Sequence, residues 1–147
     1  CLVSSATKDG MRLIAVVLNC SSMYEESKKL FEYGFDTYEK QDVTTEREVY
    51  GKIAVDKGRN KEISVLYGKS AYLPVKKNTV ADITTTVNLP ESVTAPVKKG
   101  DVIGEIVYQN KTDGGSVIVP LLAGENVLSH TFWGNIKEMF LRILSIF

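Results

Sequence analysis

The sequence predicts a mainly β protein: a small antiparallel β-sandwich, preceded by a β-hairpin with one helix and followed by an amphipathic C-terminal helix. Two apolar runs flank Asp9-Gly10, a dipeptide that favours a tight hairpin turn. Short β-rich runs separated by turn residues then follow from residue 49 to residue 123. The last 17 residues repeat apolar side chains at helical spacing.

The composition excludes several classes of function. The chain has 147 residues, of which 44% are hydrophobic and 24% are charged, as in ordinary globular proteins. Its 18 basic residues balance its 18 acidic residues, which removes the electrostatic argument for binding nucleic acid. One His and two Cys are too few for a His/Cys zinc site, and no Gly-rich phosphate loop is present. The sequence therefore predicts no metal, no cofactor and no nucleic-acid partner.

Residues 1–20 are predicted to form the hairpin, with strands at residues 1–6 and 11–18. The second strand is apolar on both faces, so each face needs cover. A helix within residues 21–40, which starts at a capping box from Ser22 to Glu25, covers one face only. The other face has no evident partner in this segment. We therefore expect the hairpin to belong to a larger sheet whose remainder lies upstream of Cys1. A disulfide between Cys1 and Cys20 stays open, although two scattered thiols make no framework.

Residues 41–47 are polar and rich in Thr and Glu, and we place a domain boundary there. The predicted organisation is therefore residues 1–40, an all-β domain at 41–128, and an amphipathic helix at 129–147. The strands of the β-domain are expected at residues 49–55, 62–67, 71–75, 82–89, 102–109 and 116–122.

The C-terminal segment is predicted to be a membrane-surface helix. A helix of 17 residues is about 26 Å long, which is shorter than the roughly 30 Å hydrocarbon core of a bilayer. It also has a narrow polar strip, so lying flat at the membrane surface suits it better than spanning. The alternative is that it packs on the sandwich or on a partner protein. The residues expected to anchor it are Phe132, Trp133, Ile136, Met139, Phe140, Ile143, Leu144 and Phe147.

Three motifs resemble parts of catalytic sites, but each lacks a feature that the chemistry needs. Ser5 and Lys8 match the Ser-x-x-Lys pattern of acyl-serine enzymes, but that chemistry needs the pair on a helix, and here a strand runs into a turn. Lys111-Thr112-Asp113 has Asp where the Lys-Thr-Gly box has Gly. His130 has no nucleophile near it in sequence. The chain is therefore predicted to hold no catalytic residue of its own.

Four segments together resemble one family. Residues 1–18 look like the stretch after a Lys-Thr-Gly box, residues 26–35 like a closing helix, and residues 95–104 (Ala-Pro-Val-Lys-Lys-Gly-Asp-Val-Ile-Gly) like a recurrent segment of an all-β domain. With the terminal amphipathic helix, they resemble in order the carboxy-terminal part of a low-molecular-mass penicillin-binding protein, a serine-type D-alanyl-D-alanine carboxypeptidase.

The resemblance implies that residues 1–40 are the end of an α/β penicillin-binding domain whose catalytic boxes lie upstream. The β-domain would then be a pedestal, and the helix would tether the protein to the outer face of the bacterial cell membrane. The parent enzyme would remove the terminal D-alanine of peptidoglycan pentapeptides through an acyl-serine intermediate. The alternative is a stand-alone, non-enzymatic β-sandwich module that binds a cell-wall or protein partner.

Overall fold

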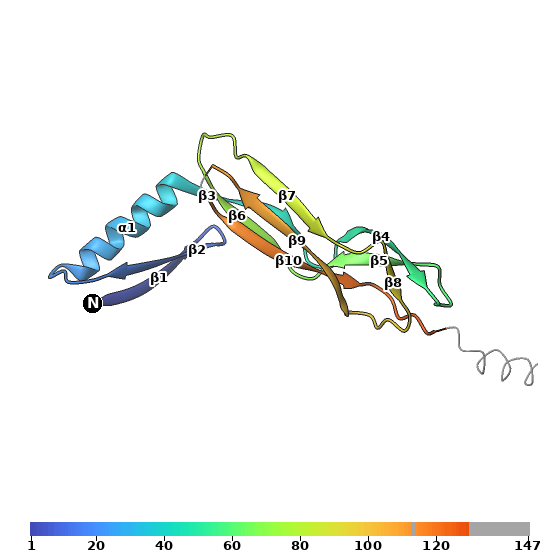
Figure 1. Cartoon of the computed structure of the whole chain (residues 1–147). Helices are drawn as coiled ribbons and strands as arrows, with labels where there is room; N and C mark the ends of the chain where they lie inside the picture. Colours follow the sequence, from blue (N-terminus) through green and yellow to red (C-terminus); the bar gives the residue numbers. More distant parts are fainter. Residues whose placement is uncertain (113, 130–147) are drawn as a thin grey trace, which may run out of the picture. The chain divides into compact units, whose positions relative to one another are not determined.

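The computed structural model describes residues 1–112 and 114–129, and β-strands dominate it (Figure 1). Within these residues ten strands and one helix follow one another along the chain. The mainly β fold class is therefore confirmed. The predicted C-terminal helix at 129–147 lies outside the described residues, apart from Ser129.

The first 17 residues form the predicted hairpin. Strands β1 (Leu2–Lys8) and β2 (Met11–Val17) pair antiparallel, from Leu2 opposite Val17 to Lys8 opposite Met11. Asp9 and Gly10 adopt φ angles of 52° and 77°, which a two-residue hairpin turn of this kind requires. Cys1 and Cys20 are both free thiols.

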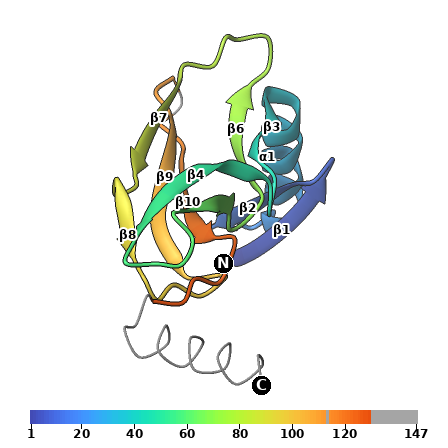
Figure 2. The ribbon, with the colours of Figure 1, turned by 90° about the vertical axis from the view of Figure 1, so that its right-hand side faces the viewer.

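Helix α1 (Met23–Thr37) packs along the inner face of the hairpin (Figures 1 and 2). Its start follows Ser22 as predicted, and the Ser22 carbonyl accepts the first helical hydrogen bond from the Glu26 N–H at 3.0 Å. The predicted capping box is wrong in one respect, because the Ser22 side chain makes no capping hydrogen bond. Its backbone, at φ −99° and ψ 43°, lies outside the β-region that a capping residue normally adopts.

The chain passes directly from α1 into strand β3 (Tyr38–Thr44), where the sequence predicted the end of the helix and then a polar boundary. The helix ends where it was expected to end, strand β3 was not predicted, and the domain boundary at residues 41–47 stays a prediction. Strand β3 pairs antiparallel with β6 (Ala71–Lys76) in a two-stranded sheet (Figure 2). The polar residues of β3 are held by backbone hydrogen bonds to β6, whose buried side chains are Ala71, Leu73 and Val75.

The remaining strands form a six-stranded sheet in the order β7-β9-β10-β5-β4-β8. The five strands predicted for this sheet are confirmed to within about one residue at each end. Strand β8 was not predicted, and it pairs parallel with β4, so the expectation of a wholly antiparallel arrangement is wrong at this pair. The strands are β4 (Val49–Asp56), β5 (Glu62–Tyr67), β7 (Ile83–Asn88), β8 (Ser92–Thr94), β9 (Val102–Asn110) and β10 (Ser116–Ala123).

Two compact units emerge from the contacts within the chain. The first comprises Cys1–Thr44, Ser70–Thr86 and Val107–Ile118, and the second comprises Thr45–Lys69, Val87–Ile106 and the described residues from Val119 onward. Each unit has its own buried apolar side chains. Those of the first include Met11, Val17, Leu73 and Val75, and those of the second include Ile63, Val65, Ile106, Val119, Leu121 and Val127.

Candidate functional site

The Ser-x-x-Lys match lies within strand β1, as the sequence predicted. Three residues apart on a strand, Ser5 and Lys8 project to opposite faces, so the amine cannot take the hydroxyl proton. The Ser5 hydroxyl instead accepts a hydrogen bond from Arg12 Nη2 at 3.2 Å across the hairpin. Both Ser5 and Lys8 are exposed. Ser5 and Lys8 are therefore surface residues of the hairpin and not a catalytic pair.

The turn between β9 and β10 holds the near match to a Lys-Thr-Gly box. Its polar groups are used within the turn: the Thr112 N–H donates to Asn110 Oδ1 at 3.0 Å, and the Asn110 N–H donates to the Gly115 carbonyl at 2.7 Å. Asn110 is fully buried, and its amide also reaches the Pro74 carbonyl at 3.4 Å. Asp113 and His130, the other residues singled out from the sequence, lie outside the described residues.

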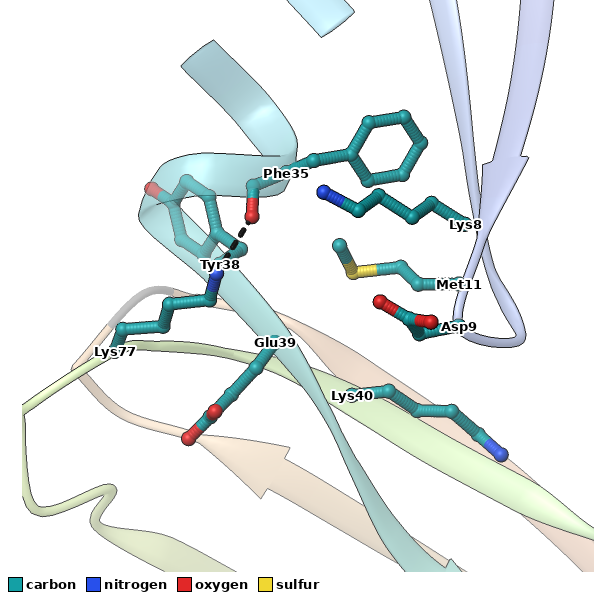
Figure 3. A pocket seen from close by; sticks show the side chains of 8 residues that line it. All are labelled: Lys8, Asp9, Met11, Phe35, Tyr38, Glu39, Lys40 and Lys77. Atoms are coloured by element: carbon teal, nitrogen blue, oxygen red, sulfur yellow. Dashed lines mark hydrogen bonds between the residues drawn. The ribbon is translucent and has the colours of Figure 1, made fainter. Parts of the chain in front are cut away.

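A cavity of about 340 Å³ lies in the first unit, beside the tip of the hairpin (Figure 3). Lys77 Nζ donates to the Phe35 carbonyl at 2.7 Å, and Lys40 Nζ pairs with Asp42 Oδ1 at 2.7 Å. Two of the cations at this cavity are thus engaged by the protein. Its lining contains no Ser or Cys that could serve as an acyl-transfer nucleophile and no His that could serve as its base. Its lining residues are Lys8, Asp9, Met11, Phe35, Tyr38, Glu39, Lys40 and Lys77.

Lys77 is a residue that sequence reasoning missed. Helix α1 has no basic side chain in its last turn, and its last carbonyls need donors. Lys77 supplies two, since its ammonium binds the Phe35 carbonyl and its N–H binds the Thr37 carbonyl at 2.9 Å. The positive charge also suits the negative end of the helix dipole. No local signal marks this role, because Lys77 lies 42 residues after Phe35.

The described part of the chain has few other features that indicate metal binding or a perturbed ionisable group. Residues 1–112 and 114–129 contain no group of three or more His, Cys, Asp or Glu side chains that is placed to hold a metal ion. On α1, the Glu26 carboxylate accepts a hydrogen bond from Lys29 and raises the pKa of that amine. This pair is solvent-exposed and has the character of a surface ion pair.

The outer face of the hairpin is the clearest candidate for a binding surface. We define it as the face opposite α1, formed by Val3, Ser5, Thr7, Arg12, Ile14 and Val16, which are paired across the two strands. Val3, Ile14 and Val16 are 69%, 68% and 56% exposed, whereas Ala15 and Val17 on the inner face are buried. The prediction that α1 covers only one face of the second strand is confirmed within the described residues.

The predicted anchor residues form the second candidate. All eight, from Phe132 to Phe147, lie outside the described residues. Among the residues that the structure does describe, no helix has both the length and the apolar character needed to cross a bilayer.

Comparison with known proteins assigns the family. The family model for the penicillin-binding protein 5 C-terminal domain matches residues 38–129. The chain is 34% identical to D-alanyl-D-alanine carboxypeptidase DacC of Escherichia coli (strain K12) over 93% of its own length. It is 30% identical to D-alanyl-D-alanine carboxypeptidase DacF of Bacillus subtilis (strain 168) over 78% of its length. It spans only 35% and 30% of these two relatives.

A solved structure agrees with these matches. The crystal structure of penicillin-binding protein 5 from Haemophilus influenzae superposes with a TM-score of 0.69 at 27% identity. The superposition covers 87% of this chain and 38% of that one. Since the family model covers well over half of the sequence, the chain belongs to the penicillin-binding protein 5 C-terminal domain family.

Proposed function

We propose that this chain is the C-terminal, non-catalytic portion of a D-alanyl-D-alanine carboxypeptidase and serves as its pedestal and membrane anchor. The observation that carries the proposal is the exposed apolar outer face of the hairpin, in a chain that spans about a third of its carboxypeptidase relatives. An exposed sheet face of this kind is normally covered by the rest of its domain.

In this proposal each of the three segments has its own role. Residues 1–40 complete a penicillin-binding domain whose remainder covers the outer face. Residues 41–128 form a small β-sandwich pedestal, and residues 129–147 lie flat on the outer face of the bacterial cell membrane. The pedestal holds the catalytic domain away from the membrane, where the domain can reach peptidoglycan.

The parent reaction needs groups that this chain lacks in its described part. A serine hydroxyl attacks the carbonyl between the two D-alanines, its proton passes to a neighbouring base, and D-alanine leaves with its amine protonated. Water then hydrolyses the acyl-serine ester. The pairs that resemble such machinery, Ser5 with Lys8 and Lys111 with Thr112, lie in a strand and a turn. The nucleophile is therefore assigned to the upstream domain.

Penicillin acylation tests this assignment. Intact-mass spectrometry of the isolated chain after incubation with a penicillin is expected to show no covalent adduct. A full-length low-molecular-mass penicillin-binding protein, treated in parallel, is the positive control. An adduct on this chain that maps to Ser5 would overturn the proposal, because it would show that the chain contains a working acyl-serine site.

Vesicle binding tests the anchor. The expected binding face presents Phe140 near its centre, and Phe140→Asp places a charge where apolar contact with lipid is needed. We expect Phe140→Asp to weaken binding to lipid vesicles at least tenfold, on the order of the loss of one buried aromatic side chain. The matched control is Asn135→Asp, which adds the same charge on the polar strip that helical spacing assigns to Asn135, Glu138 and Arg142. Equal binding by Phe140→Asp and the unmodified chain in a flotation assay would refute the anchor.

A stand-alone binding module is the competing function. It requires residues of this chain to cover both faces of the hairpin, so that no large apolar face is exposed to solvent. The exposure of Val3, Ile14 and Val16 favours the first proposal over this one.

A further inference from the structure

The turn between β4 and β5 carries three cations within five residues. Lys57, Arg59 and Lys61 lie between Asp56, where β4 ends, and Glu62, where β5 begins. All three side chains are exposed. In the sequence alone this run has the character of an ordinary solvated turn.

The structure places this turn against residues 127–129. Gly58 and Ser129 form an antiparallel bridge, and the Arg59 N–H donates to the Leu128 carbonyl at 3.2 Å. A Cβ on Gly58 would lie only 2.7 Å from Val127 Cγ1 and 2.8 Å from Val55 Cγ1, so a larger residue here would force these side chains to shift. The basic turn is therefore fixed beside the point where the chain continues into residues 130–147 (Figure 1).

The two carboxylates that flank the turn have their own partners. The Ser92 hydroxyl donates to Asp56, and Lys52 Nζ lies 3.8 Å from Glu62 Oε2. Both carboxylates lie at the strand ends and not at the tip of the turn. The charge at the tip is therefore positive.

Lys57 and Lys61 are exposed, and their ammonium groups are available to an outside anion. Within residues 1–112 and 114–129, no ion pair joins Lys57 or Lys61 to a carboxylate. Leu128, whose carbonyl accepts the hydrogen bond from the Arg59 N–H, is 65% exposed, so the segment that contacts the turn also presents an apolar side chain to solvent. Cations next to an exposed apolar residue are typical of surfaces that bind at a lipid interface.

We propose that the basic turn at residues 57–61 binds the phosphates of anionic lipid headgroups. The inference rests on the proposed function, because the anchor at residues 129–147 would bring the turn to the membrane. The anchor segment itself carries a charge of only +1, from Lys137 and Arg142 against Glu138. The turn supplies the electrostatic attraction that this segment lacks. Each basic residue held near an anionic surface strengthens binding by about fivefold.

The test compares two matched double variants of the full 147-residue chain. The first, Lys57→Gln with Lys61→Gln, removes two charges from the turn. The second, Lys76→Gln with Lys111→Gln, removes two exposed charges from the first unit. Binding is measured by flotation with vesicles of neutral phosphatidylcholine and with vesicles that contain about 30% phosphatidylglycerol. Circular dichroism shows whether each variant keeps the fold.

The turn variant is expected to bind phosphatidylglycerol vesicles about tenfold or more weakly, and neutral vesicles with less than a twofold change. The control variant should bind both as the unmodified chain does. Equal binding by the turn variant and the unmodified chain would overturn the inference, and so would an equal loss in both variants, which would reflect net charge alone. If the unmodified chain bound neither vesicle, the anchor itself would be refuted, which is a separate failure.

Discussion

Gly104 illustrates how a single residue determines the packing of strand β9. A Cβ at this position would lie 2.6 Å from the Asn88 carbonyl oxygen and 2.8 Å from Leu89 Cδ1. The closest of these atoms belongs to the backbone, which cannot rotate away as a side chain can. We therefore expect Gly104→Ala to destabilise the fold by about 1–3 kcal/mol, the usual cost of overpacking. Urea unfolding followed by circular dichroism measures this change.

Gly51→Ala is the matched control, since Gly51 also lies in a strand of the six-stranded sheet. A Cβ there would meet no atom within 4 Å. Alanine also has a lower conformational entropy than glycine in the unfolded chain, so this substitution should be neutral or stabilising by up to about 1 kcal/mol. A loss of stability as large for Gly51→Ala as for Gly104→Ala would contradict the steric explanation.

At the scale of elements, the strands with apolar alternation could be predicted from sequence, and those without it could not. Strand β5 has Ile63 and Val65 buried on one face, and this pattern is visible along the chain. Strand β3 has mostly polar residues and is a strand because β6 pairs with it. Strand β8 is three residues long and depends on its parallel pairing with β4. Pairing partners of this kind leave no local signal.

The same limit applies to the candidate site. The uncovered face of the hairpin could be predicted, because the apolar residues of β2 point to both sides while α1 covers one. The contact of Lys77 with the end of α1 and the fixing of the basic turn beside Leu128 could not. Each contact joins residues that are far apart in sequence, and each is made by hydrogen bonds to backbone carbonyls, which hydrophobic periodicity does not encode.

At the scale of the whole molecule, a chain that spans a third of its relatives and leaves an apolar sheet face open should bind other apolar surfaces. We expect it to bind a hydrophobic dye and to self-associate. Since the anchor segment would also bind dye, the comparison is made in chains that carry Phe140→Asp. Adding Ile14→Thr and Val16→Thr should then lower dye fluorescence about twofold or more, because threonine keeps the β-branched shape and presents a hydroxyl.

The control for this comparison is Val80→Thr, which changes a side chain that is 93% exposed outside the strands. It should leave dye fluorescence unchanged, because an isolated exposed valine is ordinary, whereas a contiguous face is a binding surface. Sedimentation of the same samples should show less self-association only when the outer face is altered. If the chain were monomeric and bound no dye before any substitution in the hairpin, the face would need no cover. The stand-alone module would then be the better account, since nothing upstream would be required to complete the sheet.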